Sequence, residues 1–280
     1  MASDGKRGRV LLFGGVQRGQ GSGDLGDTWL WERGAWQRQD VSGPSPRRAA
    51  AATYDASREV VVLFGGLAGR RLYGDTWEWD GRSWTQKKAA GPSPRTHHAL
   101  AYDASKGEVV LFGGRDGGGF LGDTWTWDGA VWTLRNSAGP GPRRNHALVA
   151  DPRRAVLVLF GGMRRGGLLD ETWEWDGERW DRREPANTPG PRRVPGGMVY
   201  DPRLQACVLF GGKDDRGELR GDTWAYDGKD WRRLADPAVA PLPRHWVQLA
   251  WDAGRQRLLL FGGQVLQSGE EITVDEQWGR

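Results

Sequence analysis

Apolar and polar positions follow two patterns that alternate along this chain. The run EVVLFGG, which begins at Glu108, is continuously apolar at its centre, and such a run is typical of a strand buried on both faces. The flanking segments HALAYD and DTWTWD alternate with a period of two, and the DG pair at residues 128–129 favours a hairpin turn before AVWTLRN. No segment has a convincing helical period, so the pattern predicts units of four short strands in a chain that is nearly all β.

This unit is repeated along the whole chain. The tripeptide FGG begins at residues 13, 64, 112, 160, 210 and 261, so successive copies lie 48 to 51 residues apart. Each copy is preceded by an apolar strand and followed by a glycine-rich loop of varying length that leads to a DTW-like motif. Four antiparallel strands recurring at this period predict the blades of a β-propeller.

The repeated residues resemble those of the kelch-repeat family. The shared features are the double glycine after an apolar strand, the aromatic residue of DTW, and a final tryptophan in the fourth strand. That last position is occupied by Trp36, Trp84, Trp132, Trp180 and Trp231. The resemblance, which is to bacterial kelch-repeat proteins and to the central propeller of galactose oxidase without its copper site, implies one propeller domain over residues 1–280. Kelch propellers serve many functions, so activity has to be argued from the site.

The number of blades depends on how the ends of the chain are used. Six copies of the second strand predict six blades of four antiparallel strands with incomplete terminal blades. The first unit starts at its second strand, RGRVLLFGG, and the last runs out at VDEQWGR, where Trp278 resembles a decayed third-strand aromatic residue. Ring closure would then pair the terminal units. A five-bladed ring with spare terminal segments is the alternative.

Tryptophan and cysteine usage both favour architecture over chemistry. Fourteen of the 17 Trp residues fall at three repeating positions, which is expected of core residues between blades. The single cysteine, Cys207, aligns with apolar strand residues of the other units, so we expect it to be buried and inert. Copper chemistry of the galactose oxidase type needs a Cys to Tyr crosslink with His ligands around it, and nothing in the sequence supports one. We expect no cofactor.

The overall charge says little about partners. The formal net charge is +4, and no run of Lys or Arg is long enough to indicate a nucleic-acid arm or a basic membrane patch. The sequence MASDGKRGRV lacks a signal-peptide core, and no stretch of 18 apolar residues occurs. We therefore expect a cytoplasmic protein that binds neither nucleic acid nor membranes.

An arginine that follows proline recurs in every opening segment, and an acid recurs at the start of every third strand. In an antiparallel blade, the starts of the first and third strands lie at the same end. We therefore expect structural ion pairs within one blade or between neighbours. The arginines are Arg47, Arg95, Arg143, Arg192 and Arg244, and the acids are Asp27, Asp75, Asp123, Glu171 and Asp222.

The residues after each of these arginines vary, and they should surround the mouth of the central channel. The three-residue segments are 48–50, 96–98, 144–146, 193–195 and 245–247. They contain all four histidines of the chain and the aperiodic Trp246. Arg48, Arg144 and Arg193 are not needed for the structural pairs, and in the loops after FGG basic and acidic residues nearly cancel. The mouth should therefore favour an anion.

Three functions are compatible with such a mouth. The first is a binding or scaffold module for an anionic small molecule or an acidic peptide, with Trp246 as an apolar wall and ligand contacts from Arg48, Arg144, Asn145 and Arg193. The second is an enzyme that isomerises, eliminates or cyclises a small anion with His97, His146 and His245 as candidate acid and base groups. The third is metal-dependent catalysis through the same three histidines, although no acid and no HxH or HExxH spacing accompanies them.

The histidines themselves divide into two groups. His98 and His146 occupy the same repeat position, three residues after the arginine, which favours a structural role for both. His97 and His245 have no counterpart in the other repeats, so they are the sharper candidates for a site.

Overall fold

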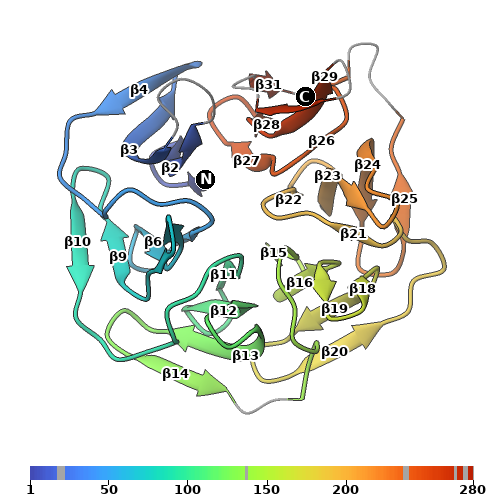
Figure 1. Cartoon of the computed structure of the whole chain (residues 1–280), viewed down its shortest axis with the longest axis horizontal. Helices are drawn as coiled ribbons and strands as arrows, with labels where there is room; N and C mark the ends of the chain where they lie inside the picture. The colour runs from blue at the N-terminus through green and yellow to red at the C-terminus, as the bar shows by residue number, and fades with distance from the viewer. Residues whose placement is uncertain (18–22, 136–137, 236–239, 268–269, 274–276, 280) are drawn as a thin grey trace.

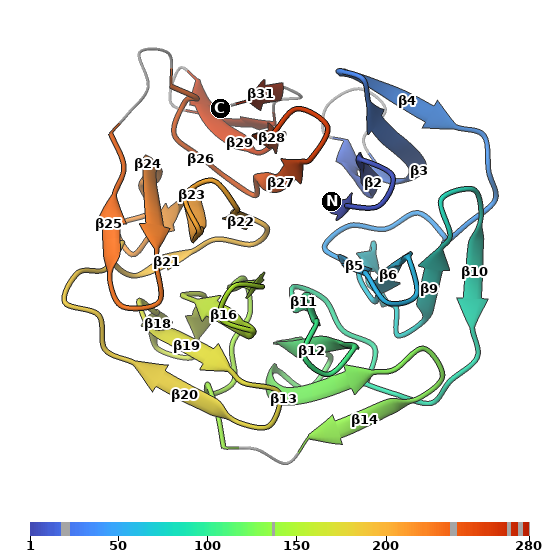
Figure 2. The same cartoon turned by 180° about the vertical axis from the view of Figure 1, so that it is seen from behind.

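The computed structural model describes residues 1–17, 23–135, 138–235, 240–267, 270–273 and 277–279, and every regular element in these residues is a β-strand. The strands form radial sheets arranged in a ring (Figure 1). The view from behind shows the same ring, with the N-terminal segment near its axis (Figure 2). The all-β propeller expected from the repeats is confirmed.

Five repeats form blades with a continuous sheet of at least four strands. The first blade contains β1 (Ala2–Asp4), β2 (Arg9–Gln17), β3 (Gly23–Glu32) and β4 (Ala35–Gln39). The second contains β5 (Ala51–Asp55), β6 (Val60–Phe64), β9 (Thr76–Trp79) and β10 (Trp84–Lys87), and the third contains β11 (Ala99–Asp103), β12 (Glu108–Arg115), β13 (Phe120–Trp127) and β14 (Trp132–Arg135).

The next two blades follow the same order. The fourth contains β15 (Ala147–Asp151), β16 (Val156–Phe160), β19 (Thr172–Trp175) and β20 (Trp180–Arg183). The fifth contains β21 (Arg192–Arg193), β22 (Met198–Asp201), β23 (Ala206–Asp214), β24 (Leu219–Tyr226) and β25 (Trp231–Arg233). Two hairpins in the loops after FGG pair β7 (Leu67–Ala68) with β8 (Arg71–Leu72) and β17 (Met163–Arg164) with β18 (Gly167–Leu168).

The last repeat is divided between two three-stranded sheets. Its strands are β26 (Arg244–His245), β27 (Gln248–Asp252), β28 (Arg257–Phe261), β29 (Gln264–Gln267), β30 (Glu270–Thr273) and β31 (Gln277–Gly279). In the described residues one sheet has the order β26-β29-β30 and the other β27-β28-β31. Among the described residues, five blades therefore have a continuous sheet of four or five strands, as in the five-blade alternative, and the expectation of six such blades is not met. The sixth repeat still lies in the ring, where β27 contacts both β22 and β1.

The terminal segments also differ from expectation. The first unit does not begin at its second strand, because β1 supplies an inner strand that pairs with β2. Ring closure does not pair the terminal units in one sheet: β1 belongs to the first blade, while β27 and β28 form their own sheet. In that sheet Trp278 pairs with Leu260, as Trp125 pairs with Leu111, so its backbone occupies the third-strand position expected for it.

The core lies between neighbouring blades and is built by the repeated aromatic residues. Val109, Val110, Leu111 and Phe112 of β12 are completely buried, as expected for a strand covered on both faces. Fourth-strand tryptophans donate their indole N–H to the threonine of the DTW motif in the preceding blade, as in the bond of 2.9 Å from Trp132 to Thr76 Oγ1. The same bond recurs from Trp84, Trp180 and Trp231 to Thr28, Thr124 and Thr172. The repeated tryptophans are therefore structural, as predicted.

The double glycine allows the second strand to pass close to the channel mouth. Gly113 has a φ of 63°, and a Cβ there would lie 2.8 Å from the carbonyl oxygen of Arg143. Gly114 has a φ of 98°, and its Cβ would lie 2.8 Å from both the Thr96 carbonyl oxygen and the His98 Cβ. Only glycine combines this backbone conformation with so close an approach, which explains the repetition of the motif.

Candidate functional site

The arginine that opens each blade is a buried structural group. Arg95 is 1% exposed and forms a bidentate ion pair with Asp123. The distances from its two terminal nitrogens to the carboxylate oxygens are 2.6 and 2.8 Å. It also donates to the Gly113 carbonyl oxygen at 3.1 Å, and Asp123 accepts the indole N–H of Trp125 at 2.7 Å. The arginine bond holds the pKa of Asp123 below its ordinary value against the opposing effect of burial. Within the described residues the equivalent pairs are Arg47 with Asp75, Arg143 with Glu171, and Arg192 with Asp222. The sequence left open pairing within one blade or between neighbours, and these four pairs each lie within one blade.

The segments that follow these arginines form the channel mouth, which comprises residues 48–50, 96–98, 144–146, 193–195 and 245–247. Their backbones join neighbouring blades: the amide of His97 donates to the Ala49 carbonyl oxygen, Asn145 to His97, and Val194 to Asn145, at 3.2, 3.1 and 2.9 Å. A set of left-handed residues accompanies these bonds. Ala49, His97, Asn145 and Trp246 have φ values of 51 to 59°. Backbone strain of this kind in non-glycine residues is concentrated at functional sites.

His97 and Trp246 meet at the mouth although they belong to the third and the last repeat. Their ring centroids lie 5.2 Å apart with an interplanar angle of 60°, an edge-on contact. His245 is 2% exposed and lies beside Trp246, with ring centroids 5.8 Å apart. The two aperiodic aromatic residues predicted for the mouth, His97 and Trp246, are thus in direct contact.

His97 is uncharged at neutral pH. Burial, followed by the positive charges of Arg144, Arg115 and Arg48, lowers its pKa from 6.5 to about 4. Its Nδ1 atom is buried and has no hydrogen-bond partner in the structure. The side chain can therefore donate or accept one hydrogen bond, but the protonated form needed for a general acid is scarce at pH 7.

His98 and His146 belong to the framework of the blades. Each ring lies edge-on against the FGG phenylalanine of the preceding blade: His98 against Phe64 at 5.6 Å and His146 against Phe112 at 5.4 Å. His98 Nε2 is also hydrogen bonded to the Phe64 carbonyl oxygen at 3.1 Å. Burial lowers the pKa of His98 well below its ordinary value and that of His146 to about 3. Their equivalent packing favours the structural interpretation over a catalytic role for His146.

The three candidate arginines are in different environments. Arg48 is partly exposed and forms an ion pair with Asp24, which also accepts the amide of Gly69. Arg193 lies on β21 and is partly buried. Arg144 lies over the ring of Phe120, with 5.1 Å between its guanidinium carbon and the ring centroid, and donates to the Met163 sulfur at 3.7 Å.

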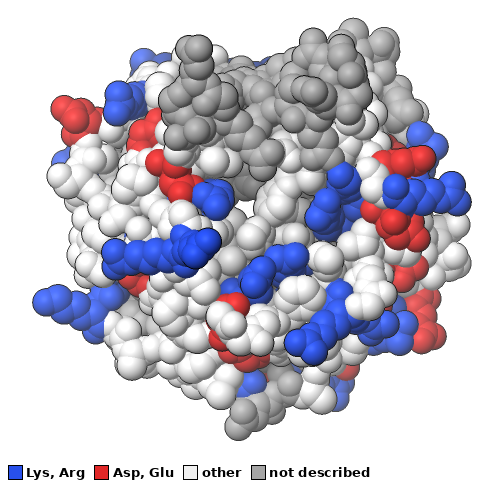
Figure 3. Space-filling view, viewed as in Figure 1, with Lys and Arg blue, Asp and Glu red and all other residues white. Residues whose placement is uncertain are grey.

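Arg144 is surrounded by positive charge. Burial and the charges of Arg115 and Arg193 lower its pKa, and its Nε atom is buried without a partner. Across the described part of the chain, none of Arg115, Arg144 and Arg193 has an ion pair with a carboxylate. We call Arg115, Arg144 and Arg193 the arginine cluster. Basic side chains are prominent near the centre of the face that carries the loops (Figure 3).

Sequence reasoning missed the part played by Arg115 and Phe120, which belong to a loop after FGG. The strand pairing in the structure reveals it, because the first residue after the double glycine pairs with the first residue after the repeat arginine. The pairs are Arg48 with Leu67, Thr96 with Arg115, Arg144 with Met163, and Arg193 with Lys213. These bridges bring the beginning of each loop over the mouth. Asn145 differs from expectation in being 2% exposed, with its Oδ1 buried and unpartnered.

The candidate metal ligands do not form a set. Among the described residues, no three His, Cys, Asp or Glu side chains are grouped so that they could hold a metal ion, and this includes His97, His146 and His245. Cys207 is completely buried, and burial raises its pKa well above the ordinary value. Both observations agree with the expectation of an inert Cys207.

The ring of blades, together with the repeated ion pair of arginine and acid and the tryptophan that bonds to the acid, defines a kelch-type β-propeller. Residues 3–138 match the KLHDC2/KLHL20/DRC7 Kelch-repeats domain family, and together with the ring of blades this match supports membership of the kelch-repeat propellers. No curated protein matches the chain. In the parts of the chain that the structure describes, no helix is long and apolar enough to cross a membrane.

Proposed function

We propose that this kelch propeller is a binding module whose channel mouth recognises an anionic group, carried by a small molecule or by an acidic peptide. The observation that carries the proposal is the arginine cluster. Arg144 is partly desolvated and is under the positive charges of Arg115 and Arg193, and no carboxylate in the described residues neutralises it. Close positive charges raise the free energy of the unliganded protein, and an anion bound by the guanidinium forks relieves that repulsion.

The other mouth residues define the remaining sides of such a site. Trp246 provides an apolar surface, and the unpartnered Nδ1 of His97 supplies one further hydrogen bond. Arg48 contributes less than Arg144 and Arg193 because Asp24 already neutralises it. The proposal treats residues 1–280 as one propeller domain acting in the cytoplasm, without a cofactor.

The enzymatic alternative receives less support from the geometry. A general acid or base works best when its pKa lies near the operating pH. The pKa of His97 lies near 4 and that of His146 near 3, and His146 is packed into the framework. The proposed function is therefore binding of an anion, and acid or base chemistry by these histidines is the less favoured alternative.

The test is isothermal titration of the protein with phosphate, citrate and a short polyglutamate peptide. Arg144→Ala and Arg193→Ala should each weaken binding of the preferred anion about tenfold or more, since a hydrogen bond to a charged group contributes about 1.5–3 kcal/mol. Arg82→Ala is the matched control, because Arg82 is exposed in a turn at the far end of its blade. Equal affinities for the wild type and both cluster variants would refute the proposal.

A further inference from the structure

The mouth leads into a large cavity along the axis of the ring. The cavity has a volume of about 1140 Å³ and is lined by the inner strands of all the repeats, β1, β5, β11, β15, β22 and β27. Pockets for small molecules usually have volumes of about 300–1,000 Å³, so this space is large enough for a ligand.

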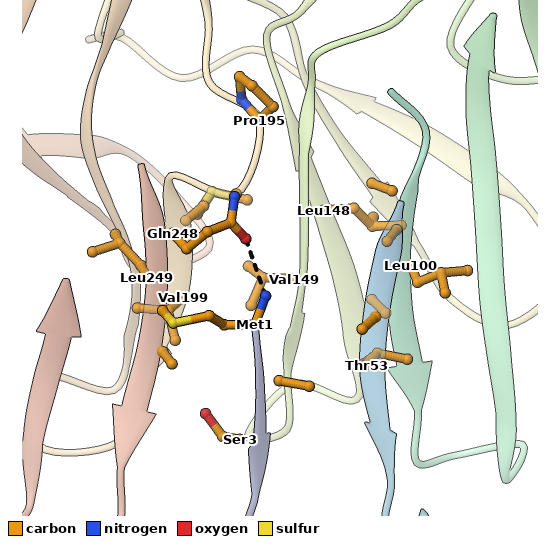
Figure 4. Close-up of a pocket in the computed structure, with 18 of the residues that line it drawn as sticks. Met1, Ser3, Thr53, Leu100, Leu148, Val149, Pro195, Val199, Gln248 and Leu249 are labelled. Carbon is orange, nitrogen blue, oxygen red and sulfur yellow. Dashed lines mark hydrogen bonds between the residues drawn. The ribbon is translucent and has the colours of Figure 1, made fainter. Parts of the chain in front are cut away.

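The wall of this cavity is mainly apolar. Leucine and valine residues from several inner strands line it (Figure 4). Two of its polar groups are already hydrogen bonded: the Gln248 Oε1 accepts the Met1 nitrogen at 3.2 Å, and the Ser3 Oγ accepts the Trp251 amide at 3.0 Å. The leucine and valine residues labelled in Figure 4 are Leu100, Leu148, Val149, Val199 and Leu249. Such a surface favours apolar groups over ions.

The apolar cavity and the arginine cluster meet at His97. His97 and Trp246 both line the cavity, and their edge-on contact lies at its mouth. Arg115 pairs with Thr96, which precedes His97. Asn145, which follows Arg144, donates its amide to the His97 carbonyl oxygen, so the backbone places both arginines beside this point. One ligand could therefore contact the arginines and the apolar wall together only by passing this aromatic pair.

We infer that the ligand is an amphiphilic anion, whose charged group binds the arginine cluster and whose apolar chain enters the central cavity past His97 and Trp246. The inference rests on the proposed function for its charged end and on the cavity for its apolar end. An unbranched carboxylate is the simplest member of this class. A charged group alone would leave the apolar wall unused.

The experiment measures the affinity of the full chain for straight carboxylates from acetate to decanoate, below the concentrations at which they form micelles. Each methylene that enters the cavity should tighten binding about fourfold, the equivalent of about 0.8 kcal/mol per buried CH₂. Thr53→Phe, which fills the cavity from β5, should abolish this dependence on chain length. Thr53→Val is its matched control and should preserve the dependence, because it keeps the size of the side chain.

Thermal melting shows whether each variant is folded, and Val149→Phe on β15 narrows the cavity independently if Thr53→Phe melts early. The inference is overturned if chain length has no effect on affinity in the wild type. If Arg144→Ala still weakens acetate or phosphate in that case, the proposed function stands without the apolar site. If decanol binds as tightly as decanoate and Arg144→Ala changes neither, both the amphiphile and the anion-binding function are refuted.

Discussion

Two adjacent arginines show how differently the framework and the mouth of this propeller use the same residue. Arg143 is 1% exposed, is paired with Glu171 at 2.5 Å, and donates to the Gly161 carbonyl oxygen. Arg144 lies over the ring of Phe120 under the positive charges of Arg115 and Arg193, and no described carboxylate neutralises it. The first position is an arginine in five repeats, whereas the second is Arg, Thr or His. The repeated residue stabilises the blade, and the variable one is available for a ligand.

The largest expected difference is in stability. Arg143→Ala should lower the free energy of unfolding by about 3 kcal/mol, because it leaves the Glu171 carboxylate without its buried partner. Arg144→Ala should change that free energy by less than about 1 kcal/mol, since it removes a repelled charge. Urea unfolding of both variants measures the comparison. An unchanged stability for Arg143→Ala, with loss of anion binding, would mean that the repeat arginine belongs to the site.

Acidification should weaken the folded state through its buried histidines. The pKa values of His97 and His146 are about 4 and 3 in the folded chain, against about 6.5 in an unfolded one. Between these values the unfolded chain binds protons that the folded chain does not, so the free energy of unfolding falls as the pH drops from about 6.5 toward 4.

The variant His97→Gln isolates the contribution of His97, at the mouth, to this pH dependence from the contributions of His98 and His146 in the framework. Melting temperatures measured from pH 7 to pH 5 should fall less steeply in the variant than in the wild type, while His98 and His146 continue to contribute. This range lies above the ordinary pKa values of the carboxylates that pair with the repeat arginines. Identical slopes in the two proteins would contradict the buried, neutral state of His97.

A smaller effect should distinguish two tryptophans at the same repeat position. Trp132→Phe removes a bond of 2.9 Å to Thr76 and should cost about 1 kcal/mol more than Trp36→Phe, because the indole nitrogen of Trp36 is buried without a partner among the described residues. Both rings pack on an FGG phenylalanine at similar distances, 5.3 Å from Phe64 and 5.2 Å from Phe261. Chemical denaturation of the two variants provides the measurement. Equal losses would show that packing alone accounts for the conserved tryptophan position within the chain.

Most of the fold was predictable because each element is specified locally and then repeated. The apolar run around Val110, the DG turn and the double glycine each have a short-range cause, and six copies make the pattern plain. The ends could not be predicted in the same way. The segment Ala2–Asp4 has no apolar pattern of its own, and it forms a strand only because β2 and the neighbouring blade provide a partner and a surface.

The site was only partly predictable for a different reason. Comparing repeats separated His97 from His98, and the structure places His98 in the framework and His97 at the mouth. Sequence could not show that Arg48 is neutralised by Asp24, or that Arg115 lies close to Arg144, because both relations cross between loops and blades. Contacts that form only when loops and blades come together in the folded ring leave no pattern in the sequence of a single repeat.

The left-handed positions at the mouth have a practical consequence. At residues 49, 97, 145 and 246 the chain holds Ala, His, Asn and Trp in nearly the same backbone conformation. At residues 49, 97 and 145 main-chain hydrogen bonds link neighbouring blades, whatever the side chain. Side chains at residues 49 and 97 can therefore be randomised together beside the buried Asn145, and the propeller becomes a scaffold for selecting new specificities from a library.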